Sequence, residues 1–378
     1  MKKIKLAQES KNKKIDWIVV GVISCVMFLT TFGCVMVYSA SYYSASVHYG
    51  NEYYFLTKQI MGVALGMLSM IVMCFVNFEK LLKFKWWAVL VAVVLLLLVF
   101  VPGIGIENYG ARRWVGVGGF SFQPSEIAKF VLVFFCAAYL AQNHDKIKNF
   151  KTLLPPLAVG GAFCLLVIIE PNMSITMCLA FVLVIMLFIG GMNLKHAAFL
   201  GVVGFLAVPL LIFLEPYRVS RLMAFLDPWA SPQGEGFQLI QSLYALGNGG
   251  LFGVGLFESR QKYLFLPFAE SDFIFSIIGE ELGFFGSVLV LGVFAFLVFL
   301  LIKIARMAKN RFGALLVSGV ASIIAVQTLL NVAVVTGSIP PTGLPLPFIS
   351  AGSTSLIVFM AAIGLCLNVY KKSSPKRV

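Results

Sequence analysis

The chain has 378 residues, of which 60% are apolar and 12% charged, whereas soluble domains have roughly 45–50% apolar and about 25% charged residues. This balance excludes an ordinary soluble protein and indicates a chain solvated by lipid. The net charge of +13 does not predict a nucleic-acid partner, because the basic residues stand in short groups between apolar runs. The seven cysteines lie within apolar runs without a CxxC pair, and the three histidines are scattered. Neither a disulfide framework nor a metal site is therefore expected.

Apolar runs recur along the whole chain. A membrane-spanning helix needs about 20 mostly apolar residues. The sequence therefore predicts an all-α integral membrane protein with about ten transmembrane helices, in one membrane domain over residues 16–370 between basic tails at 1–15 and 371–378. The predicted spans are 16–40, 54–76, 84–101, 124–142, 152–169, 173–190, 195–214, 272–302, 313–337 and 350–370.

The lysines and arginines predict the orientation of these spans. Most of the 29 fall on one side if the N-terminus is inside, as the excess of basic residues in cytoplasmic loops requires. Both termini are then cytoplasmic. The loops 102–123 and 215–271, the latter between the seventh and eighth spans, are extracytoplasmic and are the only outer loops with basic residues.

The first outer loop carries Arg112 and Arg113 and leads into Glu126 and Lys129 at the start of the fourth span. Glu126 and Lys129 are three residues apart and share one helix face. One interpretation is a helix-end ion pair with a snorkelling lysine. The other is an anion-binding cluster with the two arginines, since guanidinium forks match phosphate oxygens and ionisable residues within membranes are usually functional.

The second outer loop is rich in glycine and in apolar side chains. It carries Arg218, Arg221 and Lys262, and residues 238–245 are predicted to form a short amphipathic helix at the membrane surface. The glycine-rich part lacks the GKS ending of a phosphate-binding loop, so ATP binding is not expected.

Asp272 opens the eighth predicted span, and two interpretations stand: a functional carboxylate at the outer surface, or an N-terminal helix cap. The span is long enough that it should tilt or project. Glu280 and Glu281 lie on other faces of this helix than Asp272 and are predicted to be structural partners of basic residues. The connection 337–349 is dense in proline and glycine, so it should line protein or water rather than lipid, or form a rigid turn.

Together these segments resemble the SEDS family of shape, elongation, division and sporulation proteins over about residues 16–370. The matching stretches are 110–114, 123–126 with Lys129, 225–228, 241–243, 249–253, 272–275, 279–283 and 342–348. Gly279 and the run 334–337 are more similar to the FtsW and sporulation (SpoVE-like) branch than to the RodA branch. The sequence departs from the usual family pattern at 270–271, Asn172 and 351–355.

The resemblance implies a glycosyltransferase that polymerises lipid II at the outer face of the bacterial plasma membrane, with a polyprenyl diphosphate as leaving group. The family's essential aspartate falls on Asp272, and from its position we expect Asp272 to be the catalytic base, with Glu280 as the alternative. From their charges, the expected substrate-binding residues are Arg112, Arg113, Glu126, Lys129, Arg218, Arg221 and Lys262. The implied partners are a class B penicillin-binding protein and other division or sporulation membrane proteins. The sequence identifies no cofactor and leaves open whether a divalent cation is needed.

Two further expectations concern partners and alternatives. The single helix of the transpeptidase is expected to contact the eighth and ninth spans, where Gly283 and Gly286 would allow close approach. A lipid II flippase or transporter is the alternative function. Secondary transporters place charged sites near the bilayer midplane between repeated halves, whereas the charged candidates here lie in outer loops and no internal repeat is evident. A scaffold role is compatible with the enzyme.

Overall fold

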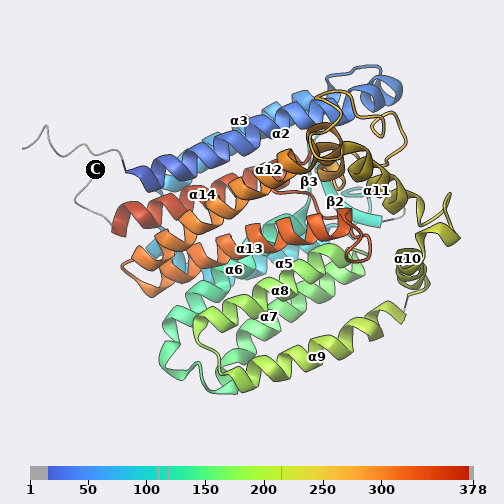
Figure 1. Cartoon of the computed structure of the whole chain (residues 1–378). Coiled ribbons are helices and arrows are strands. Elements are labelled where there is room, and N and C mark those ends of the chain that lie inside the picture. The colour runs from blue at the N-terminus through green and yellow to red at the C-terminus, as the bar shows by residue number, and fades with distance from the viewer. Residues whose placement is uncertain (1–15, 109–110, 118–119, 214, 374–378) are drawn as a thin grey trace, which may run out of the picture.

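A computed structural model describes residues 16–108, 111–117, 120–213 and 215–373 as a bundle of long helices (Figure 1). Within these residues, nine helical segments are long and apolar enough to cross a membrane. They are α2 (Trp17–Tyr49), α3 (Tyr54–Phe75), Phe78–Leu98, α6 (Pro124–Gln142), α7 (Phe150–Ile169), α8 (Met173–Gly190), α12 (Ile274–Met307), α13 (Arg311–Val335) and α14 (Ser353–Ser373). Phe78–Leu98 comprises α4 (Phe78–Leu81), η1 (Leu82–Phe84) and α5 (Lys85–Leu98). The predicted class of helical membrane protein is confirmed.

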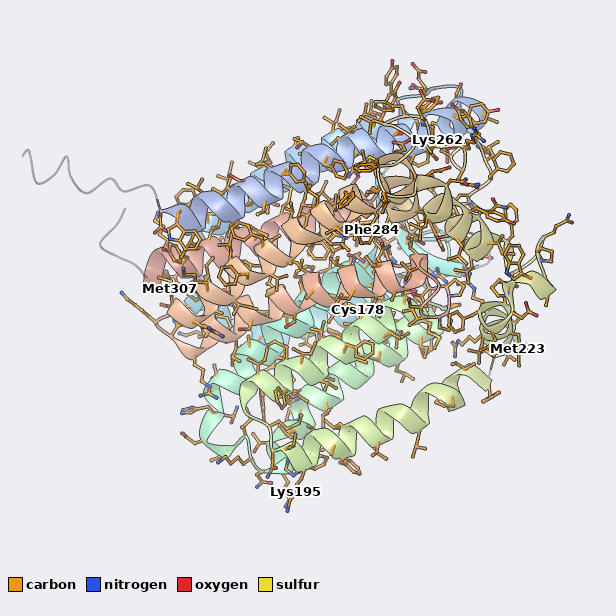
Figure 2. The ribbon with its side chains drawn as sticks, viewed as in Figure 1. Cys178, Lys195, Met223, Lys262, Phe284 and Met307 are labelled. Atoms are coloured by element: carbon orange, nitrogen blue, oxygen red, sulfur yellow. The ribbon has the colours of Figure 1, made fainter. Side chains whose placement is uncertain are left out.

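The remaining predicted span, 195–214, forms α9 (Leu194–Phe213), which is not among the nine. The two ends of the described chain lie together, because the Tyr370 hydroxyl donates to Asp16 Oδ2 at 2.6 Å. A chain that begins and ends at the same end of a bundle traverses it an even number of times. In Figures 1 and 2, α9 runs from Lys195, at the end that also holds Met307, toward Met223 on α10. We therefore assign the tenth traverse to α9.

The first predicted outer loop folds into a small antiparallel sheet, which the all-α prediction missed. Its strands are β1 (Gly105–Asn108), β2 (Ala111–Val117) and β3 (Phe120–Phe122), in the order β1–β2–β3. Strands of three to seven residues have too few alternations to be recognised beside long apolar helices. The register pairs Glu107 with Arg112 and Val115 with Phe122. The sheet therefore presents the two neighbouring arginines of β2 on opposite faces.

The second predicted outer loop contains two helices and lies at the same end of the bundle as the sheet (Figure 1). They are α10 (Pro216–Leu226), which was not predicted, and α11 (Phe237–Gly249), which contains the predicted helix at 238–245. The short η3 (Pro228–Ala230) connects them. A separate short helix outside this loop, η2 (His144–Lys146), lies between α6 and α7. This end of the molecule is thus built from ordered segments that pack on the helix ends.

The eighth span is not one continuous helix. Gly283 has φ 67° and ψ −166°, so α12 breaks there into two parts. The chain around Gly250 fills the break, because the Phe284 amide donates to the Gly250 carbonyl at 2.9 Å and the Val254 amide to the Glu280 carbonyl at 2.9 Å. A methyl group at Gly283 would lie 2.3 Å from the Gly253 nitrogen. The prediction of a single long helix was wrong, since a loop far along the chain supplies the hydrogen bonds that the break releases.

Helices α3 and α14 pack closely along their length. A methyl group at Gly62 would lie 3.2 Å from Ser353 Cα, so the backbones approach one another where glycine leaves space. The Ser353 hydroxyl also donates to the Lys58 carbonyl at 3.2 Å. This contact places the start of α14 beside Lys58.

Candidate active site

A cavity of about 520 Å³ opens at the end of the bundle that carries the sheet, α10 and α11. Four predicted site residues line it: Arg113, Glu126, Arg221 and Asp272. Its other polar lining comes from Lys58, Gln59, Ser121, Gln123, Asn172, Gln238, Glu270, Ser271, Thr342, Ser353, Thr354 and Ser355. Residues from both predicted outer loops therefore meet side chains from α3, α6 and α14 around one space.

Asp272 lies in the chain just before α12 rather than capping it. The residue at the cap position is Phe273, and no side chain caps this end. The interpretation of Asp272 as a helix cap was therefore wrong. Its backbone is held from α13, because Asn331 Nδ2 donates to the carbonyls of Asp272 at 2.8 Å and Leu344 at 2.6 Å. Its carboxylate lies over Gly343, where an added methyl group would be 2.6 Å from Oδ2.

The surroundings of Asp272 adjust its proton affinity. Burial raises its pKa to about 6, and the Arg113 and Arg221 guanidiniums oppose this rise, whereas Glu270 and Glu126 add to it. The effect of burial on the pKa therefore outweighs that of the nearby cations. A carboxyl group that titrates near neutral pH is suited to accept a proton during a reaction.

The alternation of β2 separates the two neighbouring arginines. Arg113 lines the cavity and donates from Nε to the Glu170 carbonyl at 3.3 Å and from Nη2 to the Pro171 carbonyl. Arg112 points to the other face, is about half exposed, and pairs with Glu107 at 3.0 Å. Successive side chains of a strand point in opposite directions. The predicted cluster of both arginines with Glu126 and Lys129 is therefore not formed.

Glu126 and Lys129 form the ion pair of the first interpretation, at 2.8 Å, but the buried lysine does not snorkel. Both side chains are 1% exposed, and only Glu126 lines the cavity. Lys129 also donates to Gln327 Oε1 at 2.6 Å, and Gln327 donates to the Pro345 carbonyl at 2.7 Å. This chain of contacts supports the cavity wall formed by the connection between α13 and α14.

Lys262 and Arg218 do not line the cavity. Lys262 is fully buried and pairs with Glu281 at 3.0 Å, toward the C-terminal end of α2, where Figure 2 labels it. Glu281 also accepts from the Ser39 hydroxyl at 2.6 Å, so its predicted structural role is confirmed. Glu280 instead accepts from the backbone amide of Arg260 at 3.2 Å and from other donors of the same turn.

The sequence analysis missed several residues at this cavity. Lys58 and Glu270 line it, as do Thr354 and Ser355. A lysine within an apolar span is itself a functional signal and could have identified Lys58. The others have no local signal, since their proximity depends on how α3, α12 and α14 pack. In the described part of the chain, no three His, Cys, Asp or Glu side chains gather as they would around a metal ion.

The chain was compared with known proteins. Residues 20–375 match the cell cycle protein family that comprises FtsW, RodA and SpoVE. Stage V sporulation protein E of Bacillus subtilis (strain 168) is 38% identical over 92% of this chain and 95% of its own length. The probable peptidoglycan glycosyltransferase FtsW of Geobacter sp. (strain M18) is 40% identical over 92% and 95%.

Two solved structures have the same fold. The first concerns the structural coordination of polymerization and crosslinking by a peptidoglycan synthase complex. It superposes with a TM-score of 0.76 at 29% identity, covering 95% of this chain and 98% of the other. The rod shape determining protein RodA of Thermus thermophilus superposes with a TM-score of 0.69 at 26% identity, covering 93% and 96%. The chain is a multi-pass membrane protein that belongs to the FtsW, RodA and SpoVE family of cell cycle proteins.

Proposed function

We propose that this protein polymerises lipid II into peptidoglycan strands at the outer face of the bacterial plasma membrane, for division or for sporulation. The observation that carries the proposal is the cavity in which Asp272 lies within electrostatic range of Arg113 and Arg221. A glycosyl transfer with a diphosphate leaving group needs one proton acceptor and cations for the departing charge, and these residues supply both.

In the proposed reaction, the Asp272 carboxylate takes the proton of an attacking sugar hydroxyl. The hydroxyl oxygen forms a bond to the anomeric carbon as the bond from that carbon to the diphosphate breaks, and the diphosphate leaves with the electron pair. Arg113 and Arg221 stabilise the negative charge on the departing group. One displacement inverts the anomeric carbon, so an α-linked diphosphate becomes a β-linked glycan. Glu280 is not favoured as the base, because it accepts backbone hydrogen bonds away from the cavity.

The test is polymerisation of lipid II by the purified protein, with and without a partner transpeptidase. We expect Asp272→Asn to abolish polymer formation, because asparagine cannot accept the proton. Asp227→Asn is the matched control, since Asp227 accepts from the Trp229 amide at the turn after α10 and does not line the cavity. Normal polymer from Asp272→Asn refutes the mechanism. Movement of labelled lipid II across vesicles without polymer would favour a flippase instead.

The proposed orientation places both termini in the cytoplasm and the cavity outside. It is supported by the basic residues of the predicted inner loops and by the position of α10 and α11 at the end opposite the beginning of α2 and the end of α14 (Figure 1). A reporter fused at residue 240 should read outside, and one at residue 148 should read inside. A cytoplasmic signal at residue 240 overturns the assignment of the active side.

We further propose that a class B penicillin-binding protein, together with other division or sporulation membrane proteins, assembles with this chain. Gly283 is covered by the chain's own loop, so it does not offer the close helix approach expected from the sequence. Exposed Phe252, Phe284 and Phe285 lie at this break and form the better contact surface. A photocrosslinker at Phe285 should capture the transpeptidase helix, whereas one at the similarly exposed Leu165 on α7 should not. Equal capture at both positions contradicts this contact surface.

A further inference from the structure

Asp272 lies directly after the second predicted outer loop, where no helix or strand fixes its position. The structure describes residues 250–273 without either, and the hydrogen bonds of α12 begin at the Phe273 carbonyl, which accepts from the Ser276 amide at 2.9 Å. A group that takes a proton must nevertheless be held close to its productive geometry. Contacts with other parts of the chain must therefore place Asp272.

Three successive carbonyls, those of residues 270–272, each accept a hydrogen bond from a distant part of the chain. Their donors are, in order, the Ala351 amide at 2.9 Å, the Ser350 hydroxyl at 2.6 Å and the side-chain amide of Asn331 at 2.8 Å. These donors belong to α13 and to the connection that leads into α14, and we call them the carbonyl clamp. Bonds to three successive carbonyls fix both the position and the direction of a backbone segment, because one residue cannot move without stretching the bonds of its neighbours.

The two side chains of the carbonyl clamp are themselves held on a second side. Asn331 is 1% exposed, and its amide also donates to the Leu344 carbonyl at 2.6 Å. The Ser350 hydroxyl also accepts from the Leu346 amide at 2.7 Å. Neither side chain can turn away from the Asp272 segment without leaving a further buried backbone group unpaired, which is costly.

The turn that carries Ser350 adopts an unusual conformation. Phe348 has φ 63°, in the left-handed region that a bulky residue adopts only where its surroundings impose it. The Phe348 side chain is buried, and its ring centroid lies 5.3 Å from that of Phe359 on α14. Gln59 of α3 donates to the Ser350 carbonyl at 3.3 Å. Packing from two helices therefore fixes the direction of the Ser350 hydroxyl.

The carbonyl clamp acts on residues of the candidate active site without being part of its surface. Glu270, Ser271 and Asp272 all line the cavity, whereas Asn331 and Ser350 are not among its lining residues. Asn331 and Ser350 therefore have no direct contact with a substrate in the cavity. Their hydrogen bonds also involve only the backbone of Asp272 and its neighbour, and they leave the carboxylate available for the reaction.

We propose that Asn331 and Ser350 are positioning residues, which hold the backbone at Asp272 so that its carboxylate meets the attacking hydroxyl. The inference rests on the proposed function, in which Asp272 takes the proton of that hydroxyl. It adds that the geometry of the reaction is set by the α13–α14 connection, a segment about 60–80 residues further along the chain.

The first measurement is steady-state polymerisation of lipid II by Ser350→Ala and by Asn331→Ala. We expect kcat to fall by at least about tenfold, because a displacement of about 1 Å can cost about 100-fold. KM should change little, since neither residue lines the cavity. Ser350→Thr should keep most of the rate because it keeps the hydroxyl. Ser338→Ala is the matched control, since the Ser338 hydroxyl lies 2.9 Å from that of the exposed Thr336 and does not line the cavity.

The second measurement is independent of catalysis. Amide hydrogen exchange, read by mass spectrometry on the full-length protein, reports local opening of the backbone. The peptide over 268–273 contains the Ser271 and Phe273 amides, which both donate to the Phe268 carbonyl. Exchange in this peptide should become faster in both variants, whereas exchange in α11 should stay unchanged.

The two measurements distinguish this inference from a structural role and from the proposed function. Normal kcat in the folded variants, or unchanged exchange in the peptide over 268–273, overturns the inference even if the unmodified protein polymerises lipid II. Faster exchange throughout the chain, with a lower melting temperature, assigns Asn331 and Ser350 to general stability and also overturns it. Faster exchange confined to that peptide, in a protein that makes no polymer, supports the carbonyl clamp and counts against the polymerase. If Asn331→Ala does not fold, Ser350→Ala, which removes a single oxygen atom, decides the question.

Discussion

Substituting Gly343 by alanine tests whether the position of the Asp272 carboxylate matters for catalysis. Gly343 is not among the residues with positive φ, so its backbone accepts alanine without strain. The new methyl group would lie 2.6 Å from Asp272 Oδ2, whereas ordinary contacts begin at 3.4 Å. The carboxylate must therefore move by roughly 0.8 Å, and a misplacement of about 1 Å can reduce a rate by about 100-fold. We expect kcat to fall by that order, which corresponds to about 2.7 kcal/mol in the barrier.

The assay is steady-state polymerisation of lipid II by Gly343→Ala in the same detergent as the unmodified protein. KM should change little, because the substitution leaves Arg113 and Arg221 in place. Gly247→Ala on α11 is the control, since a methyl group there meets nothing within 4 Å. A folded Gly343→Ala protein with kcat within twofold of the unmodified protein refutes the argument that this carboxylate position is required.

Three further predictions follow from the charges. Asp272 must be ionised to act as a base, and its pKa is raised to about 6, so the polymerisation rate should rise through pH 6 and level off above it. Arg221→Ala removes a cation that lowers this pKa, so it should move the midpoint of the pH–rate profile to higher pH. A shift of the midpoint to lower pH contradicts the assignment of Asp272 as the base. Lys262→Ala leaves the buried Glu281 without its cationic partner, so it should destabilise the protein by about 3–5 kcal/mol. The melting temperature should fall, and a Lys262→Met/Glu281→Gln variant should partly restore it. An unchanged melting temperature of Lys262→Ala would contradict this. Arg113→Ala should lower kcat far more than Arg112→Ala in the polymerisation assay, and equal losses would disprove the separation of these two side chains by β2.

The sequence by itself determined the class of protein, because spanning a membrane is a local requirement. Each span must supply about 20 apolar residues whose backbone groups bond within the segment, and such runs are visible without knowing their neighbours. The short amphipathic helix within α11 and the family membership were predicted in the same way, and the ion pair of Glu126 with Lys129 was one of two interpretations. Each rests on residues close together in the chain or on the order of motifs.

Only the tertiary structure decided which residues share the cavity. The turn at Gly283 depends on a loop about 30 residues earlier that supplies its hydrogen bonds. Arg113 faces the cavity and Arg112 does not, because a sheet formed where no strand was predicted. Lys58 meets the start of α14 across almost 300 residues, since Gly62 lets the two helices approach. Such contacts arise from packing between distant segments, and no local pattern of polarity encodes which distant segments become neighbours.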